Sequence, residues 1–405
     1  MIGSLFTGVS GLNANATAMS VIGDNIANVN TTAFKSNSTS FANILSRSLC
    51  GSASNNVGRG VELWGTSASW NQGSLETTGN PTDLAINGNG FFMVKDTSGS
   101  IYYTRAGAFT FDKNGNLVNP DGLRIQGYEI DPATGGLRSI SDIRTGSNHS
   151  PARATEEMSM NMNLDGGAVD GEAYSNTMTV YDSLGNALEM SIDFTYDGGN
   201  NRWDWTASSS DGTCTTTGTL AFDSYGELNA ATVAAGNPVI EITNLSSGAA
   251  DLEIEWSYIS GGQSDGSITG FSGSSSVSSL SQDGYAAGDL QTVSVDEDGV
   301  ITGIYSNGQV TALYQLALAD FPSYWGLESA GHGLYSESSA SGTATPGIPG
   351  SSSLGSISPS SLEMSNVDLA SEFVKMITTQ RAFQANSKVI TTSDEILTDL
   401  INIKR

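Results

Sequence analysis

The stretch LFTGVSGLNANATAMSVIGDNI, Leu5–Ile26, repeats an apolar or small residue at alternating spacings of four and three. The repeating positions are Leu5, Val9, Leu12, Ala16, Met19, Gly23 and Ile26. This heptad spacing predicts an α-helix with one narrow seam, made of smaller side chains than a strong coiled coil uses. Each glycine costs a helix up to about 1 kcal/mol relative to alanine, so we expect this helix to need a partner.

The C-terminal stretch SNVDLASEFVKMITTQRAFQANSKVITTSDEILTDLINIKR, residues 365–405, carries a matching pattern. One heptad row is Met376, Phe383, Ile390 and Leu397, the row beside it is Val389, Ile396 and Ile403, and the opposite flank starts at Phe373. Ser365 followed by Asp368 resembles a capping box and predicts the start of the helix. The alternative is an ordinary surface helix folded back on its own domain. The seam at the other end of the chain favours two terminal helices that pair.

Composition narrows the classes of function. The chain has 405 residues and only 14% charged residues, yet its net charge is -26, so the charges are mostly acidic. Nucleic acids and anionic membrane surfaces attract Lys and Arg, so the excess of acidic over basic residues argues against both as partners. The 48 glycines are typical of chains with many short strands and tight turns. Cys50 and Cys214 allow one disulfide, although two unrelated thiols is the favoured interpretation.

Between the two ends the apolar period changes to two, which predicts strands. MSMNMNL places Met158, Met160, Met162 and Leu164 on one face, and TMTVYDSLGNALEMSIDFTY reads as strand, turn and strand. RWDWTA, TLAFDSYGEL, VIEIT and DLEIEWSYI predict further strands. We expect an antiparallel sheet with one face in water. Residues 146–284 contain 19 Asp and Glu residues against Arg153 and Arg202, so we expect this region to be the most solvent-exposed.

A second β region is split around the first. Its halves contain the hairpin turns Asn114-Gly115, Asp298-Gly299 and Asn307-Gly308 between alternating runs. The predicted fold class is mainly β with paired α-helical termini, arranged as nested discontinuous domains with an inner helical coiled-coil layer and two β-rich outer domains. The expected parts are a terminal helical domain (1–30 and 364–405), extended connecting segments (31–70 and 355–363), a discontinuous β domain (71–145 and 285–354) and an inserted outer β domain (146–284).

Residue patterns for catalysis or metal binding are weak. His149 and His332 lie in unrelated loops, and neither cysteine has a partner at metal-ligand spacing, so we predict no catalytic, cofactor or metal site. DKNGN at residues 112–116 resembles the start of a calcium loop. Leu117 stands where that loop needs glycine and Leu123 where it needs a bidentate Glu, so a hairpin turn is the better interpretation.

The first residues also fail to match a targeting segment. Residues 1–23 contain no Lys or Arg, and Asn13, Asn15 and Thr17 interrupt their apolar run. A cleavable secretory signal and a membrane span are both disfavoured. We therefore expect a protein that either stays in the cytoplasm or leaves the cell by a route that cleaves no signal.

Two long motifs, one at each end, resemble the axial proteins of the bacterial flagellar rod and hook. They are GLNANATAMSVIGDNIANVNTTAFKS, followed by TSFANIL, and SNVDLASEFVKMITTQRAFQANSKVITTSDEIL. Within that superfamily, MTVYDSLGNALEMSIDF and VDEDGVITGIYSNGQVTALYQLALADF are similar to the hook proteins. The resemblance covers residues 1 to about 195 and 285–405 and is weak between them.

The resemblance implies a structural protein of the extracellular flagellum. It implies a curved hollow homopolymer that acts as a universal joint and passes torque from rod to filament. The implied partners are further copies of the chain, the hook cap, the distal rod and hook–filament junction proteins, and the flagellar type III export apparatus. The distal rod protein, which forms a straight tube, is the nearest alternative. An extracellular β-rich adhesin is favoured by composition alone, and a secreted hydrolase lacks a credible site.

The assembly interface expected from the seams and the resemblance includes residues of both ends. These are Leu5, Val9, Leu12, Ala16, Met19, Ile26, Asn28, Asn30, Phe34, Phe373, Met376, Phe383, Ile390 and Leu397. The segment Ser20–Phe41 is rich in amides and hydroxyls, which can satisfy backbone and neighbouring groups without repulsion between identical chains. A plain polar loop is its alternative interpretation. We expect both helices to be disordered in the monomer and to become ordered on assembly.

Overall fold

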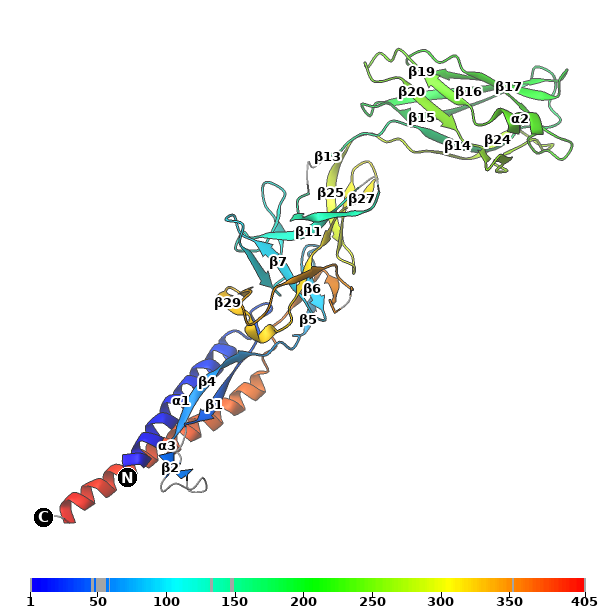
Figure 1. Cartoon of the computed structure of the whole chain (residues 1–405). Helices are drawn as coiled ribbons and strands as arrows, with labels where there is room; N and C mark the ends of the chain where they lie inside the picture. Colours follow the sequence, from blue (N-terminus) through cyan, green and yellow to red (C-terminus); the bar gives the residue numbers. More distant parts are fainter. Residues whose placement is uncertain are drawn as a thin grey trace. The chain divides into compact units, whose positions relative to one another are not determined.

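The computed structural model describes residues 2–44, 47–48, 56–57, 59–131, 134–145, 149–351 and 353–403 (Figure 1). The chain divides into two compact units. Unit 1 comprises residues 1–146, 293–303 and 311–405, and unit 2 comprises residues 147–292 and 304–310. Unit 2 is thus inserted into the sequence of unit 1. The prediction of a mainly β chain with paired helical termini is confirmed.

Two long helices of unit 1 pair with each other. They are α1 (Ile2–Ala27) and α3 (Leu369–Ile403), and the short helix η1 (Tyr324–Gly326) belongs to the same unit. Ser4 contacts Ser393 at one end of the pair and Asn25 contacts Glu372 at the other, so the helices are antiparallel. Figure 1 shows α1 in blue beside α3 in orange and red, with both chain ends at one end of the pair.

The start of α3 differs from the predicted capping box. Asp368 Oδ1 accepts a hydrogen bond from Ala370 N at 2.9 Å, so Asp368 caps the helix. The Ser365 hydroxyl accepts only from Val367 N, at 3.4 Å, ahead of the first turn. The prediction that Ser365 begins the cap was therefore wrong. The helix does not begin at Ser365 because the chain before Asp368 is extended and hydrogen-bonded to other segments of unit 1.

The strands of unit 1 form a β domain and a hairpin-like pair beside α1. They are β1 (Asn37–Asn43), β2 (Arg47–Ser48), β3 (Asn56–Val57), β4 (Val61–Ala68), β5 (Leu75–Thr77), β6 (Leu84–Asn87), β7 (Phe91–Lys95), β8 (Ile101–Thr104), β9 (Thr110–Phe111), β10 (Leu117–Val118), β11 (Arg124–Ile130), β12 (Leu137–Asp142), β28 (Leu318–Asp320), β29 (Glu328–Gly331), β30 (Leu334–Ser336), β31 (Thr345–Gly347), β32 (Ser356–Pro359) and β33 (Ser361–Glu363). Three strands run across the limits of the units: β25 (Gly288–Val295), β26 (Val300–Tyr305) and β27 (Val310–Leu316).

The main sheet of the β domain joins early and late parts of the sequence. Its strand order includes β27-β11-β7-β8-β30-β29. Alternation along β7 places Phe92 and Val94 in one core, with Leu84, Ile125 and Leu316, while Phe91 and Met93 face a second core. β32 pairs with β6 and β33 pairs with β5, which brings the segment before α3 onto the start of the domain.

Unit 2 contains two sheets around one core. Its elements are β13 (His149–Ser150), β14 (Glu157–Asn163), β15 (Ala173–Tyr181), β16 (Ala187–Asp197), β17 (Arg202–Ser209), β18 (Thr217–Ala221), α2 (Ala230–Ala235), β19 (Val239–Ile242), β20 (Leu252–Trp256), β21 (Ile259–Ser260), β22 (Gln263–Ser264), β23 (Ile268–Thr269) and β24 (Ser276–Gln282). One sheet has the order β15-β16-β17-β18, and the other has β19-β20-β14-β23 with β24 beside β14. As predicted, Met158, Met160, Met162 and Leu164 are all buried.

The expectation of a purely antiparallel sheet was wrong for unit 2. β14 pairs in parallel with β20 and with β23, while β14 and β24 are antiparallel. The chain forms the whole other sheet between β14 and β20, and this long connection allows a parallel return. The predicted turn at residues 112–116 is present: Gly115 N donates to Asp112 O, and the Asp112 carboxylate accepts from Asn114 N and Asn116 N.

Candidate assembly interface

The face of α1 that packs against α3 is made mostly of small residues. The buried positions are Gly8, Gly11, Ala14, Ala18, Ile22 and Asn25. A Cβ atom added to Gly11 would lie 2.8 Å from the amide atoms of Asn386, and one added to Gly8 would lie 3.0 Å from Ile390 Cγ1. The two glycines therefore permit a close helix approach that a larger residue would prevent.

Polar pairs mark both ends of the helix contact. The hydroxyls of Ser4 and Ser393 are 3.3 Å apart. Asn25, which is 1% exposed, donates to Glu372 Oε2 at 3.3 Å, and Glu372 Oε1 accepts from Lys375 at 2.6 Å. Because a buried amide is costly unless it is hydrogen-bonded, these contacts fix the register of the two helices.

The predicted seam of α1 lies beside this packed face and is only partly covered. Leu5, Leu12, Met19 and Ile26 are half-buried, whereas Val9 and Ala16 are exposed. On α3, Met376, Ile390 and Leu397 are half-buried, while Phe373 and Phe383 are exposed. That these residues form an interface between copies stays a prediction.

Large apolar side chains are exposed on both helices. On α1 these are Phe6 and Val9, and on α3 they are Leu369, Phe373, Val374, Ile377, Phe383, Val389 and Ile396. Phe6 is 66% exposed and Val374 is 61% exposed. Groups of exposed apolar residues on a soluble chain commonly mark a surface that binds protein.

The segment after α1 is organised by its own amides. Asn25 holds Asn37 through two hydrogen bonds of 2.8 Å, one from Asn25 Nδ2 to Asn37 O and one from Asn37 N to Asn25 Oδ1. Asn28 Nδ2 donates to Asp24 O at 2.9 Å, while Asn30 is exposed and Phe34 is half-buried. The predicted use of amides to satisfy backbone groups is thus confirmed at Asn25 and Asn28 within one chain.

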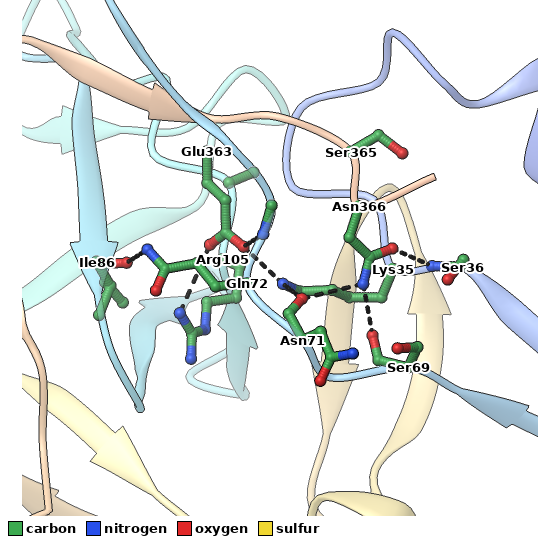
Figure 2. A network of polar contacts seen from close by, with 12 residues as sticks. Lys35, Ser36, Ser69, Asn71, Gln72, Ile86, Arg105, Glu363, Ser365 and Asn366 are labelled. Atoms are coloured by element: carbon green, nitrogen blue, oxygen red, sulfur yellow. Dashed lines mark hydrogen bonds and ion pairs between the residues drawn. The ribbon is translucent and has the colours of Figure 1, made fainter. Parts of the chain in front are cut away.

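Three charged side chains meet in the interior of unit 1, and Figure 2 shows them with their neighbours. Lys35 Nζ lies 2.6 Å from Glu363 Oε1, and Arg105 Nη1 lies 3.5 Å from Glu363 Oε2. The side chains of Lys35, Glu363 and Arg105 are 1%, 0% and 5% exposed. We refer to these three residues as the charged junction. It joins the segment after α1, the end of β8 and the last strand before α3.

Backbone and amide groups complete the charged junction. Glu363 Oε1 also accepts from Gly73 N at 2.9 Å, and Lys35 Nζ donates to Asn71 O at 2.9 Å. Asn366 lies beside them: its Nδ2 donates to Ser69 O and Asn71 O, and its Oδ1 accepts from Ser36 N (Figure 2). Each segment at the junction therefore satisfies polar groups of another segment.

Electrostatics at the charged junction reflect burial. Burial lowers the pKa of Lys35, against the opposite pull of the Glu363 carboxylate. Burial likewise lowers the pKa of Arg105, again against the attraction of Glu363. The Arg105 guanidinium carbon lies 5.3 Å from the centroid of the Phe91 ring, a cation–π distance.

Reasoning from the sequence missed the packed helix face and the charged junction. Gly8, Gly11, Ala14 and Ala18 recur at spacings of three and four, and this row of small residues is the signal that indicates a close helix contact. From the sequence alone, the glycines of α1 are interpreted only as a cost to helix stability. Lys35 and Glu363 carry no comparable local signal, because their partners are far away in the sequence.

Groups for other chemistry are dispersed in the described part of the chain. No three His, Cys, Asp or Glu side chains among the described residues gather in a way that could hold a metal ion. His332 pairs with Asp121 at 2.8 Å, and His149 pairs with Asp289. Cys214 is a half-buried free thiol, while Cys50 lies outside the described residues. No described helix is long and apolar enough to cross a membrane.

Family models match four segments of the chain. The model for the flagellar basal body rod protein matches residues 5–35, and the one for the C-terminal region of the flagellar basal body rod FlgEFG proteins matches 358–403. The D1 domain model of the flagellar hook proteins FlgE/F/G matches residues 85–161. The D2 domain model of the flagellar basal body protein FlaE matches residues 167–285, most of unit 2. Both helices and both units are therefore represented.

Relatives match over nearly the whole chain. It is 36% identical to the flagellar hook protein FlgE of Escherichia coli over 416 residues, with 98% of each chain covered. It is 35% identical to FlgE of Treponema pallidum over 469 residues, with 100% of each chain covered. A flagellar hook protein structure from Helicobacter pylori shares the fold, with a TM-score of 0.52 and 13% identity over 70% of this chain and 98% of that chain. The chain therefore belongs to the family of bacterial flagellar hook proteins.

Proposed function

We propose that the chain is the structural subunit of a flagellar hook and polymerises through its terminal helices into a curved hollow tube. The tube would act as a universal joint that passes torque from rod to filament. The observation that carries this proposal is the set of large apolar side chains that α1 and α3 leave exposed. Membership of the hook protein family supports it.

Polymer growth follows from the kind of surface that the helices offer. A subunit with two different, complementary patches forms open helical polymers instead of closed dimers. The packed face of α1 is used within the chain, which leaves the seam from Leu5 to Ile26 for neighbouring copies. The proposed order of events is that the helices of a monomer become fully ordered only when neighbours cover these seams.

The outer parts of the subunit have a different proposed role. As a curved tube rotates, subunits on the inner side of the curve crowd together and those on the outer side separate. The acidic region of residues 146–284 would supply wet, individually weak contacts that slide. The terminal segments 1–30 and 364–405 would supply the contacts that persist.

The remaining partners follow from the same proposal. They are the hook cap during growth, the distal rod and hook–filament junction proteins at the two ends of the tube, and the flagellar type III export apparatus. The location would be the flagellum outside the cell, reached without a cleaved signal peptide. The role is structural, and the proposal assigns the chain no reaction and no cofactor.

The test removes residues 1–25 from the full chain. The buried clusters of both units contain no residue from this segment, so we expect a folded β monomer that does not polymerise. Electron microscopy of both proteins at matched concentration measures the result, with the full-length chain as control. Tubes grown by the shortened chain would contradict the proposal. Straight tubes grown by the full-length chain would instead favour a distal rod protein.

A further inference from the structure

The charged junction connects, through one carboxylate, the segment that follows α1 and the segment that precedes α3. Lys35 follows α1 and Glu363 precedes α3, while Arg105 belongs to the β domain (Figure 2). All three side chains are at least nine-tenths buried. A buried ion pair adds little stability compared with an apolar pair, but losing one partner leaves a buried charge that is costly. The junction therefore fixes the relative positions of the three segments and adds little to the net stability of the fold.

The charged junction contains two positive charges and one negative charge. Two cations share the single carboxylate of Glu363, which is the only carboxylate in direct contact with them among the described residues; Asp320 attracts Arg105 more weakly, without a direct ion pair. Within the described residues, Arg105 Nε and Nη1 make no hydrogen bond, and Nη1 contacts Glu363 Oε2 only as an ion pair at 3.5 Å. Glu363 is the largest electrostatic compensation for the burial of Arg105, and the Phe91 ring, Tyr324 and Asp320 add to it.

The two connecting segments are also joined through their backbones. Ala33 N donates to Glu363 O at 2.8 Å, and Asn366 N donates to Phe34 O at 3.3 Å. Ala33 is 3% exposed and has a left-handed φ of 57°, which an alanine adopts at a cost of about 1–2 kcal/mol. Such a conformation persists only where the surroundings hold it. The segment after α1 is therefore held in place by the segment before α3.

We propose that Glu363 is a positioning residue that acts as a latch: it holds the bases of α1 and α3 together, so that the two terminal segments become ordered jointly and not one at a time. The latch forms within a single chain. Its effect on tube growth rests on the proposed function, whereas its effect on the monomer does not.

Charge counting gives the latch a specific signature. With Glu363→Gln both cations lose the carboxylate that contacts them, and Arg105 keeps only the weaker attraction of Asp320, so we expect the segment of residues 31–36 to open. With Lys35→Met one cation still pairs with Glu363, so the loss should be small. The double variant Lys35→Met/Glu363→Gln keeps one unpaired cation instead of two, and we expect it to recover part of what Glu363→Gln loses. A purely steric or hydrogen-bonding role predicts the opposite order, because the double variant removes more contacts.

The experiment measures amide hydrogen exchange of residues 31–36 by mass spectrometry in dilute full-length chain. We expect exchange about 100-fold faster in Glu363→Gln and at least about tenfold slower again in the double variant. Arg138→Gln, which breaks an exposed ion pair with Glu129 and Asp131, is the matched control and should change nothing. Near-ultraviolet circular dichroism of the aromatic side chains confirms that each variant remains folded.

The outcomes separate the latch from the proposed function. A double variant that exchanges as fast as Glu363→Gln, or faster, would overturn the latch. So would unchanged exchange in Glu363→Gln. If exchange follows the expected order while the wild-type chain forms no tubes, the latch stands and the proposed function fails. If both hold, electron microscopy should show tube growth lost in Glu363→Gln and partly restored in the double variant.

Discussion

Unit 2 and the terminal helix pair of unit 1 bury very different side chains. Unit 2 encloses Phe194, Trp203, Trp205 and Trp256, each at most 2% exposed, and the Trp205 and Trp256 rings meet edge to face at 5.3 Å. The helix pair buries glycines and alanines with Ile22, and its largest apolar side chains are exposed. One region has completed its core within the chain, and the other has not.

The difference indicates where stability comes from in each region. Full burial of a large apolar side chain contributes about 1.5–3 kcal/mol, and burial of an alanine much less. Unit 2 can therefore be stable in a single chain. The helix pair gains close packing at Gly8 and Gly11 but buries little apolar area within the chain, and we propose that neighbouring copies supply further burial. In the proposed function, a durable inserted unit is thus combined with ends whose order would be completed by assembly.

Removing a core side chain from unit 2 is the strongest test of the proposed difference in stability between unit 2 and the helix pair. Trp256→Ala should lower the free energy of unfolding of unit 2 by about 3–5 kcal/mol, because a large cavity replaces the ring. Urea unfolding followed by tryptophan fluorescence measures the loss. Tyr225→Ala, at a position that is 79% exposed, is the control and should change stability by less than about 0.5 kcal/mol.

Assembly of the same variant gives the second half of this test. If unit 2 and the helix pair have separate roles, Trp256→Ala should still form tubes at temperatures where unit 2 remains folded. If Trp256→Ala fails to assemble under those conditions while Tyr225→Ala assembles normally, unit 2 and the helix pair do not have separate roles. Unit 2 would then be needed for the contacts that persist.

A smaller effect is expected from filling the close contact between the helices. Gly11→Leu should separate α1 from α3, because even its Cβ would lie 2.8 Å from the Asn386 side chain. We expect a cost of about 1–3 kcal/mol to the helix pair and no change in the unfolding of unit 2. Gly3→Leu is the control, since a Cβ there meets no atom within 4 Å.

The readout is the lowest chain concentration at which light scattering detects polymer. Gly11→Leu should raise that concentration about tenfold or more, while Gly3→Leu should leave it nearly unchanged. Equal polymer growth in the two variants would mean that close packing of α1 on α3 within the chain is not required for assembly.

The sequence was sufficient for the elements whose signals are local. Alternation in MSMNMNL and in Leu188 to Phe194 predicted strands whose apolar residues are buried. Heptad spacing predicted both terminal helices, because it is visible within a few turns. The two end motifs predicted the family, which the relatives confirm.

Features that depend on distant segments could not be predicted in the same way. The pairing of β14 with β20 in parallel depends on how the chain returns after forming another sheet. The contact of Lys35 with Glu363 joins residues from opposite ends of the chain, and a lysine in a polar segment is normally solvated. The face of α1 that packs on α3 was misjudged because small residues have a weak apolar signal and a strong effect on helix approach.

The exposed face of one sheet in unit 2 is notably acidic. Glu241 and Glu253 lie directly opposite each other on β19 and β20, and Glu157 and Glu255 are neighbours on β14 and β20. All four side chains are exposed. Like charges across a strand pair are unfavourable, and the same charges repel a second copy of this face.

The smallest expected effect concerns this acidic face and ionic strength. Between 0.01 M and 0.1 M salt the Debye length falls from about 30 Å to about 10 Å, which screens repulsion between outer domains. We expect polymer growth to increase by a few-fold over this range.

The variant Glu157→Gln/Glu241→Gln/Glu253→Gln should grow better at low salt and respond less to added salt, because less repulsion remains to be screened. Light scattering at matched chain concentration measures how polymer growth changes with salt concentration in the wild-type chain and in the variant. Growth of the wild-type chain that falls as salt rises would mean that attraction between charges, and not repulsion, governs the contacts of the outer domains.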